Sequence, residues 1–280
     1  MSNVDFDIEM TGKLMNGISH PNYNKIYFSS NEDLKTIFSN FDFNNKNILT
    51  VLGSGDQTFH FYNKGANQVD LFDINKLTIY YYFLRKWIIN YYGTYYPNIL
   101  VNNNYFIELF SSVKPCSDLE SDVLLYWKKY FIEYDYGYCL EMFSFSNSLV
   151  EENNKLEDLS VVKEKLNNSL PNIYNTDISK ENIINKKYDV IYTSNISEWL
   201  YSNEGIFVPY NESSFVTYRD NLYDLLNDNG IVIMSNYGKY GACYPELRIF
   251  KEKFEYMELP VTKIVPRYYE ESPGYVYTKK

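Results

Sequence analysis

The stretch ILTVLGSGDQTFHFYNKGANQVDLFD, residues 48–73, has the pattern of a strand, a glycine turn, a helix and a second strand. Residues 48–52 form a short apolar run, which is typical of a strand buried on both faces of a parallel sheet. Gly53 and Gly55 allow a tight turn and the close approach of a ligand to the backbone. The residues after them predict a helix that ends at Gly65, because glycine commonly ends helices. The stretch therefore predicts one strand–helix–strand unit of a Rossmann-like fold.

The second strand of this unit, residues 69–72, leads directly into Asp73. Asp73 follows the first glycine of the turn by about 20 residues, the spacing at which Rossmann-like folds hold a ribose with a carboxylate. This spacing predicts a cofactor that contains adenosine. Ile74 and Asn75 follow the carboxylate directly, and we expect them to lie in the same site.

The residues around the glycine turn favour one adenosine-containing cofactor over the others. A dinucleotide fingerprint has a third glycine and presents a helix N-terminus to a pyrophosphate. Here Thr58 holds the position of the third glycine, and Asp56 begins the helix. The Asp56 carboxylate would repel a diphosphate and attract a positively charged ligand. The turn therefore favours S-adenosylmethionine, which has no phosphate and carries a sulfonium and an amino group, over a nicotinamide or flavin cofactor.

The α/β pattern resumes in the second half of the chain. It predicts strands at residues 172–174, 189–195 and 231–238, a helix at 213–226, and a C-terminal hairpin of residues 257–265 and 274–280. Together with the first unit, this order predicts the α/β fold of class I methyltransferases. In that fold the sheet is Rossmann-like, doubly wound, mostly parallel and seven-stranded.

We place the S-adenosylmethionine-binding domain at residues 46–280, with one extension and one insertion. Residues 1–45 predict an N-terminal helical extension with a helix from Asn31 to Phe38. Residues 92–170 carry amphipathic helical patterns, and a connection of this length inside an α/β unit is usually functional or disordered. Its apolar and aromatic side chains, for example within residues 124–131, require burial. We therefore predict a helical cap insertion that lies over the carboxyl ends of the strands and supplies the acceptor pocket.

Ligands of such sheets bind beyond the carboxyl ends of the strands. Asp177 and Ile178 follow the third predicted strand, and Ser194 and Asn195 end the fourth. We therefore expect one cofactor site formed by Gly53, Ser54, Gly55, Asp56, Asp73, Ile74, Asn75, Asp177, Ile178, Ser194 and Asn195. Asp56 and Asp177 have an alternative interpretation as helix caps, which stabilise a helix without any ligand. The pattern identifies no catalytic residue.

The composition excludes several classes of protein. The 280 residues carry a formal net charge of −10, which argues against long nucleic acid as a partner, because phosphate binding needs clustered Lys and Arg. The three cysteines lie far apart, and two histidines are too few for a His-rich metal site, so we expect no metal. No apolar run reaches the ~20 residues of a membrane span, and the N-terminus lacks a signal-peptide core. We expect a cytoplasmic protein; the oligomeric state is not predicted.

Five segments of the chain resemble, in order, the segments of a known protein family: TVLGSGDQ, VDLFDIN, YNTDI, YDVIYTSNISEWL and LLNDNGIVIMSNYG. This bacterial family is similar to the S-adenosylmethionine:diacylglycerol 3-amino-3-carboxypropyltransferases of betaine-lipid synthesis. YFSSNEDLK near the N-terminus and ESDVLLYWKKYF in the insertion also resemble it, so the resemblance covers most of the chain.

The resemblance implies roles for individual residues. By this resemblance Gly53 and Gly55 line the cofactor, Asp73 binds its ribose, Asp177 lies near the adenine amine, and Asn195 faces the amino-acid end. Asn31 and Glu32 are implied to close over the cofactor. No residues that match a lipid-recognition motif are identified.

Three functions fit these observations. The leading hypothesis is an S-adenosylmethionine-dependent transferase, most simply a methyltransferase that acts on a small-molecule or lipid-like, apolar acceptor. The first alternative is a 3-amino-3-carboxypropyl transferase, because the outcome depends on which carbon of the sulfonium faces the acceptor. The second alternative is a non-catalytic regulatory protein that binds S-adenosylmethionine, because no catalytic base is identified.

Overall fold

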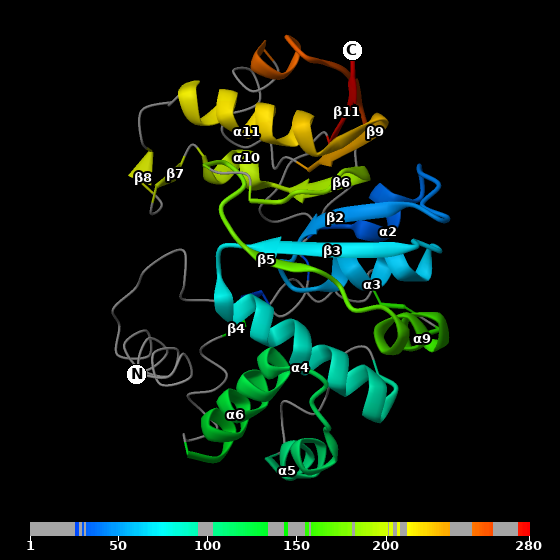
Figure 1. Ribbon diagram of the computed structural model, residues 1–280, viewed down its shortest axis with the longest axis vertical. Helices are drawn as coiled ribbons and strands as arrows, with labels where there is room; N and C mark the ends of the chain where they lie inside the picture. The colour runs from blue at the N-terminus through cyan, green and yellow to red at the C-terminus, as the bar shows by residue number, and fades with distance from the viewer. Residues whose placement is uncertain are drawn as a thin grey trace.

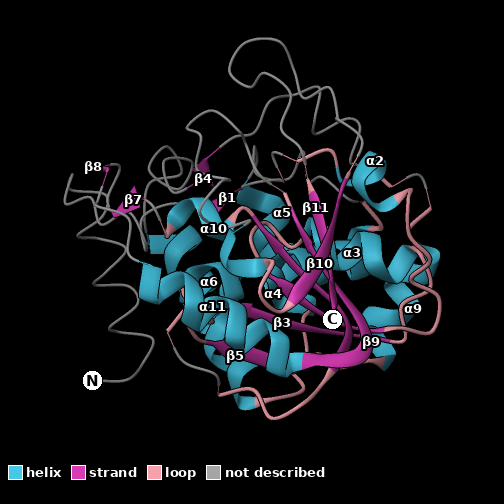
Figure 2. Cartoon of the chain, turned by 90° about the horizontal axis from the view of Figure 1, so that it is seen from above, coloured by secondary structure: helices cyan, strands magenta, loops and turns pink. Residues whose placement is uncertain are grey.

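A sheet of seven strands runs through the computed structural model, with helices on both of its faces (Figure 1). The strands fan out when seen from above in Figure 2, as the ordinary twist of a sheet requires. The structure describes residues 26–27, 30, 32–94, 103–133, 143–144, 155–156, 158–180, 183–200, 202–203, 206–207, 212–235, 248–259 and 274–280.

The order of the strands defines the class of fold. Across the sheet the strands lie in the order β10 (Phe254–Glu258), β11 (Tyr275–Lys279), β9 (Leu226–Met234), β6 (Tyr188–Ser194), β2 (Asn47–Val51), β3 (Gln68–Asp73) and β5 (Ile173–Asn175). Only β11 runs antiparallel to its neighbours. The chain winds from β2 outward to β3 and β5, and then returns to the other side of β2 to form β6 and β9. This is the predicted Rossmann-like, doubly wound sheet of the class I methyltransferase fold.

Two details of the sheet differ from the sequence-based expectation. We expected a strand that begins at residue 231, but β9 begins earlier, at Leu226. Leu226 pairs with Tyr188 and Ile231 pairs with Val190, so the intervening residues form an irregularity within the strand. The first strand of the C-terminal hairpin also begins earlier than expected, at the start of β10.

Two short strand pairs and eight helices complete the described elements. β1 (Ile26–Tyr27) pairs with β4 (Phe143–Ser144), and β7 (Ser202–Asn203) pairs with β8 (Ile206–Phe207). The described helices are α2 (Leu34–Phe38), α3 (Asp56–Asn63), α4 (Lys76–Tyr92), α5 (Asn103–Ser112), α6 (Asp118–Glu133), α9 (Ser160–Asn168), α10 (Ile196–Trp199) and α11 (Glu212–Leu225).

Each face of the sheet has its own apolar core, because successive side chains of a strand point to opposite faces. In β2, Ile48 belongs to one core and Leu49 to the other, and Val190 and Ile191 of β6 are separated in the same way. Helices α2, α3, α4 and α9 contribute to the first core, and α11 contributes to the second. Figure 2 shows α3 and α9 together on one side of the strands and α11 on the other.

Local signals explain where the helices around the glycine turn begin and end. Gly65 has a φ of +84°, which favours glycine, and it follows the end of α3 as predicted. Asn75 caps α4, because its Oδ1 accepts the backbone N–H of Leu77 at 3.0 Å. The N-terminal helix α2 starts at Leu34 and not at Asn31, because the Asp33 side chain caps it by accepting from Thr36.

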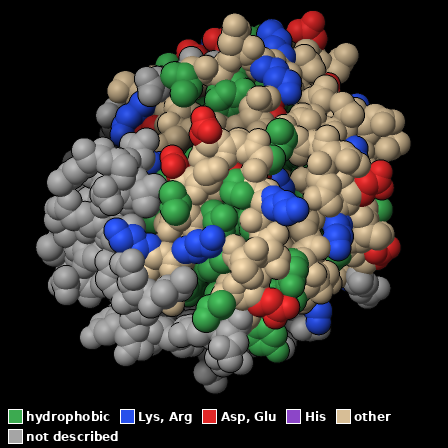
Figure 3. Space-filling view, turned by 60° about the horizontal axis from the view of Figure 1, so that its bottom comes forward, with side chains coloured by type: hydrophobic (Ala, Val, Ile, Leu, Met, Phe, Trp, Pro, Cys, Tyr) green, Lys and Arg blue, Asp and Glu red, His purple; other side chains and the backbone are tan. Residues whose placement is uncertain are grey.

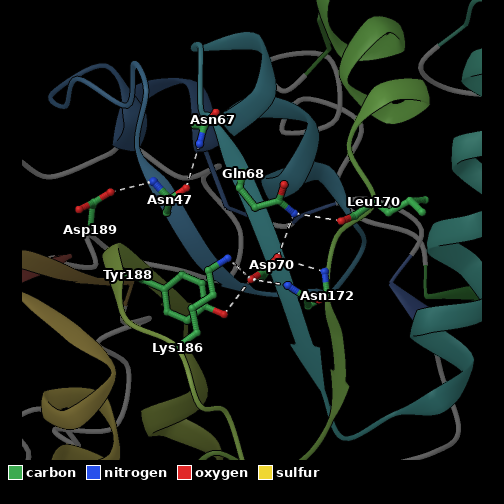
Figure 4. A network of polar contacts seen from close by, with 9 residues as sticks. All are labelled: Asn47, Asn67, Gln68, Asp70, Leu170, Asn172, Lys186, Tyr188 and Asp189. Carbon is green, nitrogen blue, oxygen red and sulfur yellow. Dashed lines mark hydrogen bonds and ion pairs between the residues drawn. The ribbon is translucent and has the colours of Figure 1, made fainter.

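A polar network ties three strands together at the amino end of the sheet (Figure 4). Its centre is the buried carboxylate of Asp70 in β3, which accepts from Lys186 Nζ at 2.8 Å and from Tyr188 Oη at 2.9 Å. The backbone N–H of Asn172, beside β5, donates to the same carboxylate. Burial raises the pKa of Asp70, but the hydrogen bonds from Lys186 and Asn172 outweigh burial and hold the pKa below its ordinary value. The network lies at the opposite ends of the strands from the glycine turn and stabilises the sheet.

The described helices of the predicted insertion pack against α4. The indole N–H of Trp127 donates to the carbonyl of Tyr80 at 2.9 Å, and Lys86 pairs with Glu120 at 2.7 Å. The rings of Phe106 and Phe131 stack at 3.9 Å and join α5 to α6. These apolar side chains are buried among the helices, and the acceptor pocket of the insertion stays a prediction.

The outer face of this helical layer carries exposed apolar side chains among charged ones (Figure 3). Ile107 and Leu125 are among these exposed residues. Residues 134–142 and 145–154 of the insertion lie outside the described residues, so the position of a cap over the carboxyl ends of the strands stays a prediction. In the described part of the chain, no group of three or more His, Cys, Asp or Glu side chains is placed to hold a metal ion. None of the described helices is long and apolar enough to cross a membrane.

Candidate functional site

The glycine turn lies between the end of β2 and the start of α3. Gly53 has a φ of +50° and Gly55 a φ of +87°, a region of backbone conformation that favours glycine. The turn is fixed to the neighbouring strand, because the Gly53 N–H donates to Asp73 Oδ2 at 3.1 Å. The side-chain amide of Gln57 lies beside Gly53, 3.3 Å from the place that a Cβ there would occupy. The turn and Asp73 therefore form one rigid unit.

Asp73 is held at the carboxyl end of β3 by backbone groups. Its Oδ1 accepts the N–H of Asn75 at 2.8 Å, and its Oδ2 accepts the N–H of Gly53. Burial raises the pKa of Asp73 to about 6, although these backbone hydrogen bonds act in the opposite direction. Asp73 therefore titrates close to neutral pH, and a ligand that donates hydrogen bonds to it favours its ionised form.

Ile74 and the end of β5 lie next to this carboxylate. The Asn175 side chain donates to the carbonyl of Asp73 at 2.8 Å and to that of Ile74 at 3.1 Å. The side chain of Ile74 is 38% exposed beside the half-buried acid. Thr176 donates its N–H to the Asp73 carbonyl, and its buried hydroxyl has no hydrogen-bond partner among the described residues. This side of Asp73 thus combines an exposed apolar surface with an unsatisfied hydroxyl.

The structure gives Asp56 protein partners where we expected a ligand. Asp56 Oδ1 pairs with Arg85 Nη1 at 2.6 Å, and both side chains are buried. Asp56 Oδ2 accepts the backbone N–H of Ser30 at 2.5 Å and the hydroxyl of Ser54 at 2.9 Å. The N-cap of α3 is Gly55, so the alternative interpretation of Asp56 as the N-cap is wrong by one residue, and the cofactor contact of Asp56 stays a prediction. Asp56 and Ser54 fix the turn to α4 and to the N-terminal segment.

Asp177 and Ile178 follow β5 and make mainly structural contacts. Asp177 Oδ1 accepts from the backbone and the hydroxyl of Ser179, and Oδ2 pairs with Lys180 at 3.0 Å. Burial raises the pKa of Asp177, but these contacts outweigh burial and hold the pKa below its ordinary value. These contacts lie within a turn at residues 178–180, and no helix is described directly after Asp177 for it to cap. Ile178 is buried in the second core, where its side chain packs among apolar neighbours.

Ser194 and Asn195 lie at the end of β6, where the backbone is unusual. Ser194 has a φ of +54°, a conformation that non-glycine residues adopt rarely and that often marks functional sites. Its hydroxyl donates to Glu32 Oε1 at 2.7 Å and lies 3.3 Å from Asn195 Oδ1. Both residues are half-buried. Asn31, which the resemblance implied beside Glu32, lies outside the described residues.

Several residues of this region were not assigned a role from the sequence. Gln57 and Thr176 each carry a buried side-chain oxygen without a hydrogen-bond partner among the described residues. Gln57 belongs to the GSGDQ motif, and its position next to the glycine turn could have identified it as a candidate site residue. Ser235 lies at the carboxyl end of β9, as Ser194 lies at the carboxyl end of β6. Because ligands of such sheets bind beyond the carboxyl ends of the strands, Ser235 could have been predicted as a site residue. The role of Arg85 could not be predicted, because nothing in the sequence of the apolar helix α4 indicates that Arg85 pairs with Asp56.

Comparisons with known proteins give matches among solved structures alone. A scan against protein-family models gives no match, and a search of curated proteins gives none either. The chain is similar to the N-methyltransferase NodS from Bradyrhizobium japonicum WM9 in complex with S-adenosyl-L-homocysteine, with 9% identity and a TM-score of 0.45 over 96% of this chain and 97% of that one. A methyltransferase from Pyrococcus furiosus shares 12% identity, with a TM-score of 0.43 over 99% of this chain and 98% of that one.

A third similar structure is magnesium protoporphyrin IX methyltransferase (ChlM) from Synechocystis PCC 6803 with bound SAM. It shares 11% identity, with a TM-score of 0.41 over 100% of this chain and 85% of that one. Because these identities and TM-scores are low, the fold is assigned from the strand order of the sheet, and the comparisons transfer no activity to this chain.

Proposed function

We propose that this chain binds S-adenosylmethionine at the carboxyl end of its sheet and transfers a group from it. The observation that carries the proposal is the unit of Gly53 and Asp73, in which a half-buried carboxylate at the end of β3 is fixed to a glycine turn after β2. In Rossmann-like folds a carboxylate at this place binds the ribose hydroxyls. Ile74, exposed beside Asp73, offers an apolar surface for an adenine ring.

The start of α3 fits this cofactor better than a dinucleotide. A pyrophosphate would lie against the N-terminus of this helix. That position holds the Asp56 carboxylate, and the backbone of Ser30 lies against it at 2.5 Å. The Arg85 side chain compensates the charge of Asp56 from inside the protein. Because Asp56 and the Ser30 backbone already occupy the helix start, a diphosphate is disfavoured there, whereas S-adenosylmethionine places no phosphate at that position.

Group transfer from S-adenosylmethionine requires few catalytic groups from the protein. The sulfonium of S-adenosylmethionine is a good leaving group, so the alignment of an acceptor with the transferred carbon supplies most of the acceleration. The residues of this chain bind and orient the cofactor, and no general base is assigned. We propose methyl transfer to a small-molecule or lipid-like acceptor. The net charge of −10 disfavours long nucleic acid as that acceptor.

Product analysis tests the proposal. The purified protein is incubated with S-adenosylmethionine and a panel of small amine, hydroxyl and lipid acceptors, and the nucleoside products are separated by chromatography. S-Adenosylhomocysteine that forms only with an acceptor supports methyl transfer. Methylthioadenosine in its place indicates 3-amino-3-carboxypropyl transfer. Binding without either product indicates a regulatory protein, and the absence of binding contradicts the proposal.

A further inference from the structure

Glu32 connects three hydroxyl groups at the carboxyl ends of β6 and β9. Tyr192 donates to Glu32 Oε2 at 2.5 Å, and Ser194 donates to Oε1 at 2.7 Å. Ser235, the first residue after β9, also donates its hydroxyl to Oε1. Glu32 and Ser235 are separated by 203 positions in the sequence. The fold therefore assembles this cluster from three distant segments of the chain.

The hydrogen-bond capacity of the two serines determines what they can bind. A hydroxyl has one proton to donate and two lone pairs with which to accept. Ser194 and Ser235 both direct their proton to Glu32, so toward a ligand each hydroxyl can act only as an acceptor. The amide oxygen of Asn195, 3.3 Å from Ser194 Oγ, adds another acceptor. Such a group of oxygens selects a ligand atom that donates hydrogen bonds. Burial raises the pKa of Glu32, although the hydrogen bonds from Ser235, Tyr192 and Ser194 act in the opposite direction, and a cation at the serines favours its ionised form.

The position of the cluster in the sheet indicates which cation it meets. Asp73, the ribose ligand of the proposed function, ends β3 on one side of β2, and Ser194 ends β6 on the other side. The glycine turn after β2 lies between them. In the proposed function adenine lies against Ile74, toward β5, so the amino-acid arm of the cofactor would extend the other way, toward β6 and β9.

The N-terminal segment joins the cluster to the glycine turn. The backbone N–H of Glu32 donates to the Ser30 hydroxyl at 3.2 Å, and the backbone N–H of Ser30 donates to Asp56 at 2.5 Å. Glu32 is thus held at a fixed place relative to the turn as well as to the strand ends.

We propose that Ser194 and Ser235, oriented by Glu32, accept hydrogen bonds from the α-amino group at the amino-acid end of S-adenosylmethionine. This inference rests on the proposed function and names the ligand group that the second half of the site recognises. The serines contact the ligand, and Glu32 is a positioning residue, because it acts through their hydroxyls.

The test compares two ligands that differ only in the α-amino group, so a difference in their affinities reports the contribution of that group. Isothermal titration calorimetry compares S-adenosylhomocysteine with its analogue that lacks the α-amino group but keeps the adenosine, the thioether and the carboxylate. The wild-type protein is expected to bind S-adenosylhomocysteine at least about tenfold tighter, the value of one charge-assisted hydrogen bond. Glu32→Gln is expected to remove most of this preference by weakening S-adenosylhomocysteine alone. Ser235→Ala is expected to reduce the preference while it leaves the Glu32 contacts to Tyr192 and Ser194 in place.

Two control variants separate the inference from the proposed function. Asp73→Ala is expected to weaken both ligands alike, and Glu120→Gln, the same chemical change in α6, is expected to leave both affinities unchanged. Equal binding of the two ligands by the wild-type protein overturns the inference and leaves the proposed function standing. Equal weakening of both ligands by Glu32→Gln and by Ser235→Ala overturns it too. If neither ligand binds the wild-type protein, the proposed function fails and the inference fails with it.

Discussion

Gly53 and Asp73, at the ends of two neighbouring strands, are joined by a hydrogen bond of 3.1 Å from the backbone N–H of the glycine to the carboxylate. The bond fixes the carboxylate relative to the turn before any ligand is present. A site that is organised in advance loses less entropy when its ligand binds. The pair is therefore the most direct target for variants.

Asp73→Ala is expected to reduce the affinity for S-adenosylhomocysteine. The variant loses two charge-assisted hydrogen bonds to the ribose, each worth about 1.5–3 kcal/mol. Calorimetry measures the dissociation constant, and circular dichroism shows whether the variant is folded. A folded variant with the dissociation constant of the wild-type protein would refute the ribose assignment.

The affinity for methylthioadenosine is expected to fall at acidic pH. The pKa of Asp73 is about 6 because of its burial, and the ribose hydroxyls donate to its ionised form. Below that pKa the free protein holds a proton that it must release on binding, so the dissociation constant rises by about tenfold for each unit of pH. Calorimetry from pH 5 to pH 8 measures this effect. Methylthioadenosine lacks the amino-acid arm, so we expect the protonation of Glu32 to leave its dissociation constant unchanged. A dissociation constant that does not change across this range speaks against the assignment.

Asp70→Asn is expected to lower stability without changing cofactor affinity. The substitution breaks contacts with Lys186 and Tyr188 inside the buried network at the amino end of the sheet. Leaving such groups unsatisfied costs about 1–3 kcal/mol. Denaturant unfolding measures the loss, and calorimetry with S-adenosylhomocysteine measures the affinity. A variant of unchanged stability, or one with strongly weakened binding, would contradict the structural role of Asp70.

Arg85→Met is expected to destabilise the protein strongly. The arginine is buried with Asp56, and removal of one partner of a buried ion pair costs about 3–5 kcal/mol. Arg219→Met is the matched control, because Arg219 is also buried but the acids that pair with it are more exposed, so a smaller loss of stability is expected. Denaturant unfolding compares the two variants. An equal loss of stability in both would mean that the Arg85 pair has no special role in the turn.

The local parts of the site were predictable because short-range signals determine them. The apolar run before Gly53, the helix that ends at Gly65 and the acid at the end of the next strand all lie within one stretch of sequence, and the structure has β2, α3 and β3 in those places. The order of α/β units also predicted a doubly wound sheet, and the strand order confirms it.

The long-range contacts were not predictable in the same way. Asp56 carried a charge at a helix start, but the sequence could not show that Arg85 would neutralise it from α4. The aromatic residues of α6 needed burial, but the sequence could not show that Trp127 would pack against Tyr80 of α4. The contact of Glu32 with Ser235 joins opposite parts of the chain, so only the assembled fold reveals it.

Calorimetric titration of the wild-type protein with S-adenosylhomocysteine and with NAD tests the central claim most directly. The account predicts saturable binding of S-adenosylhomocysteine and no appreciable binding of NAD, because Asp73 can hold a ribose while Asp56 and Ser30 lie where a pyrophosphate would have to bind. Tighter binding of NAD than of S-adenosylhomocysteine would contradict it.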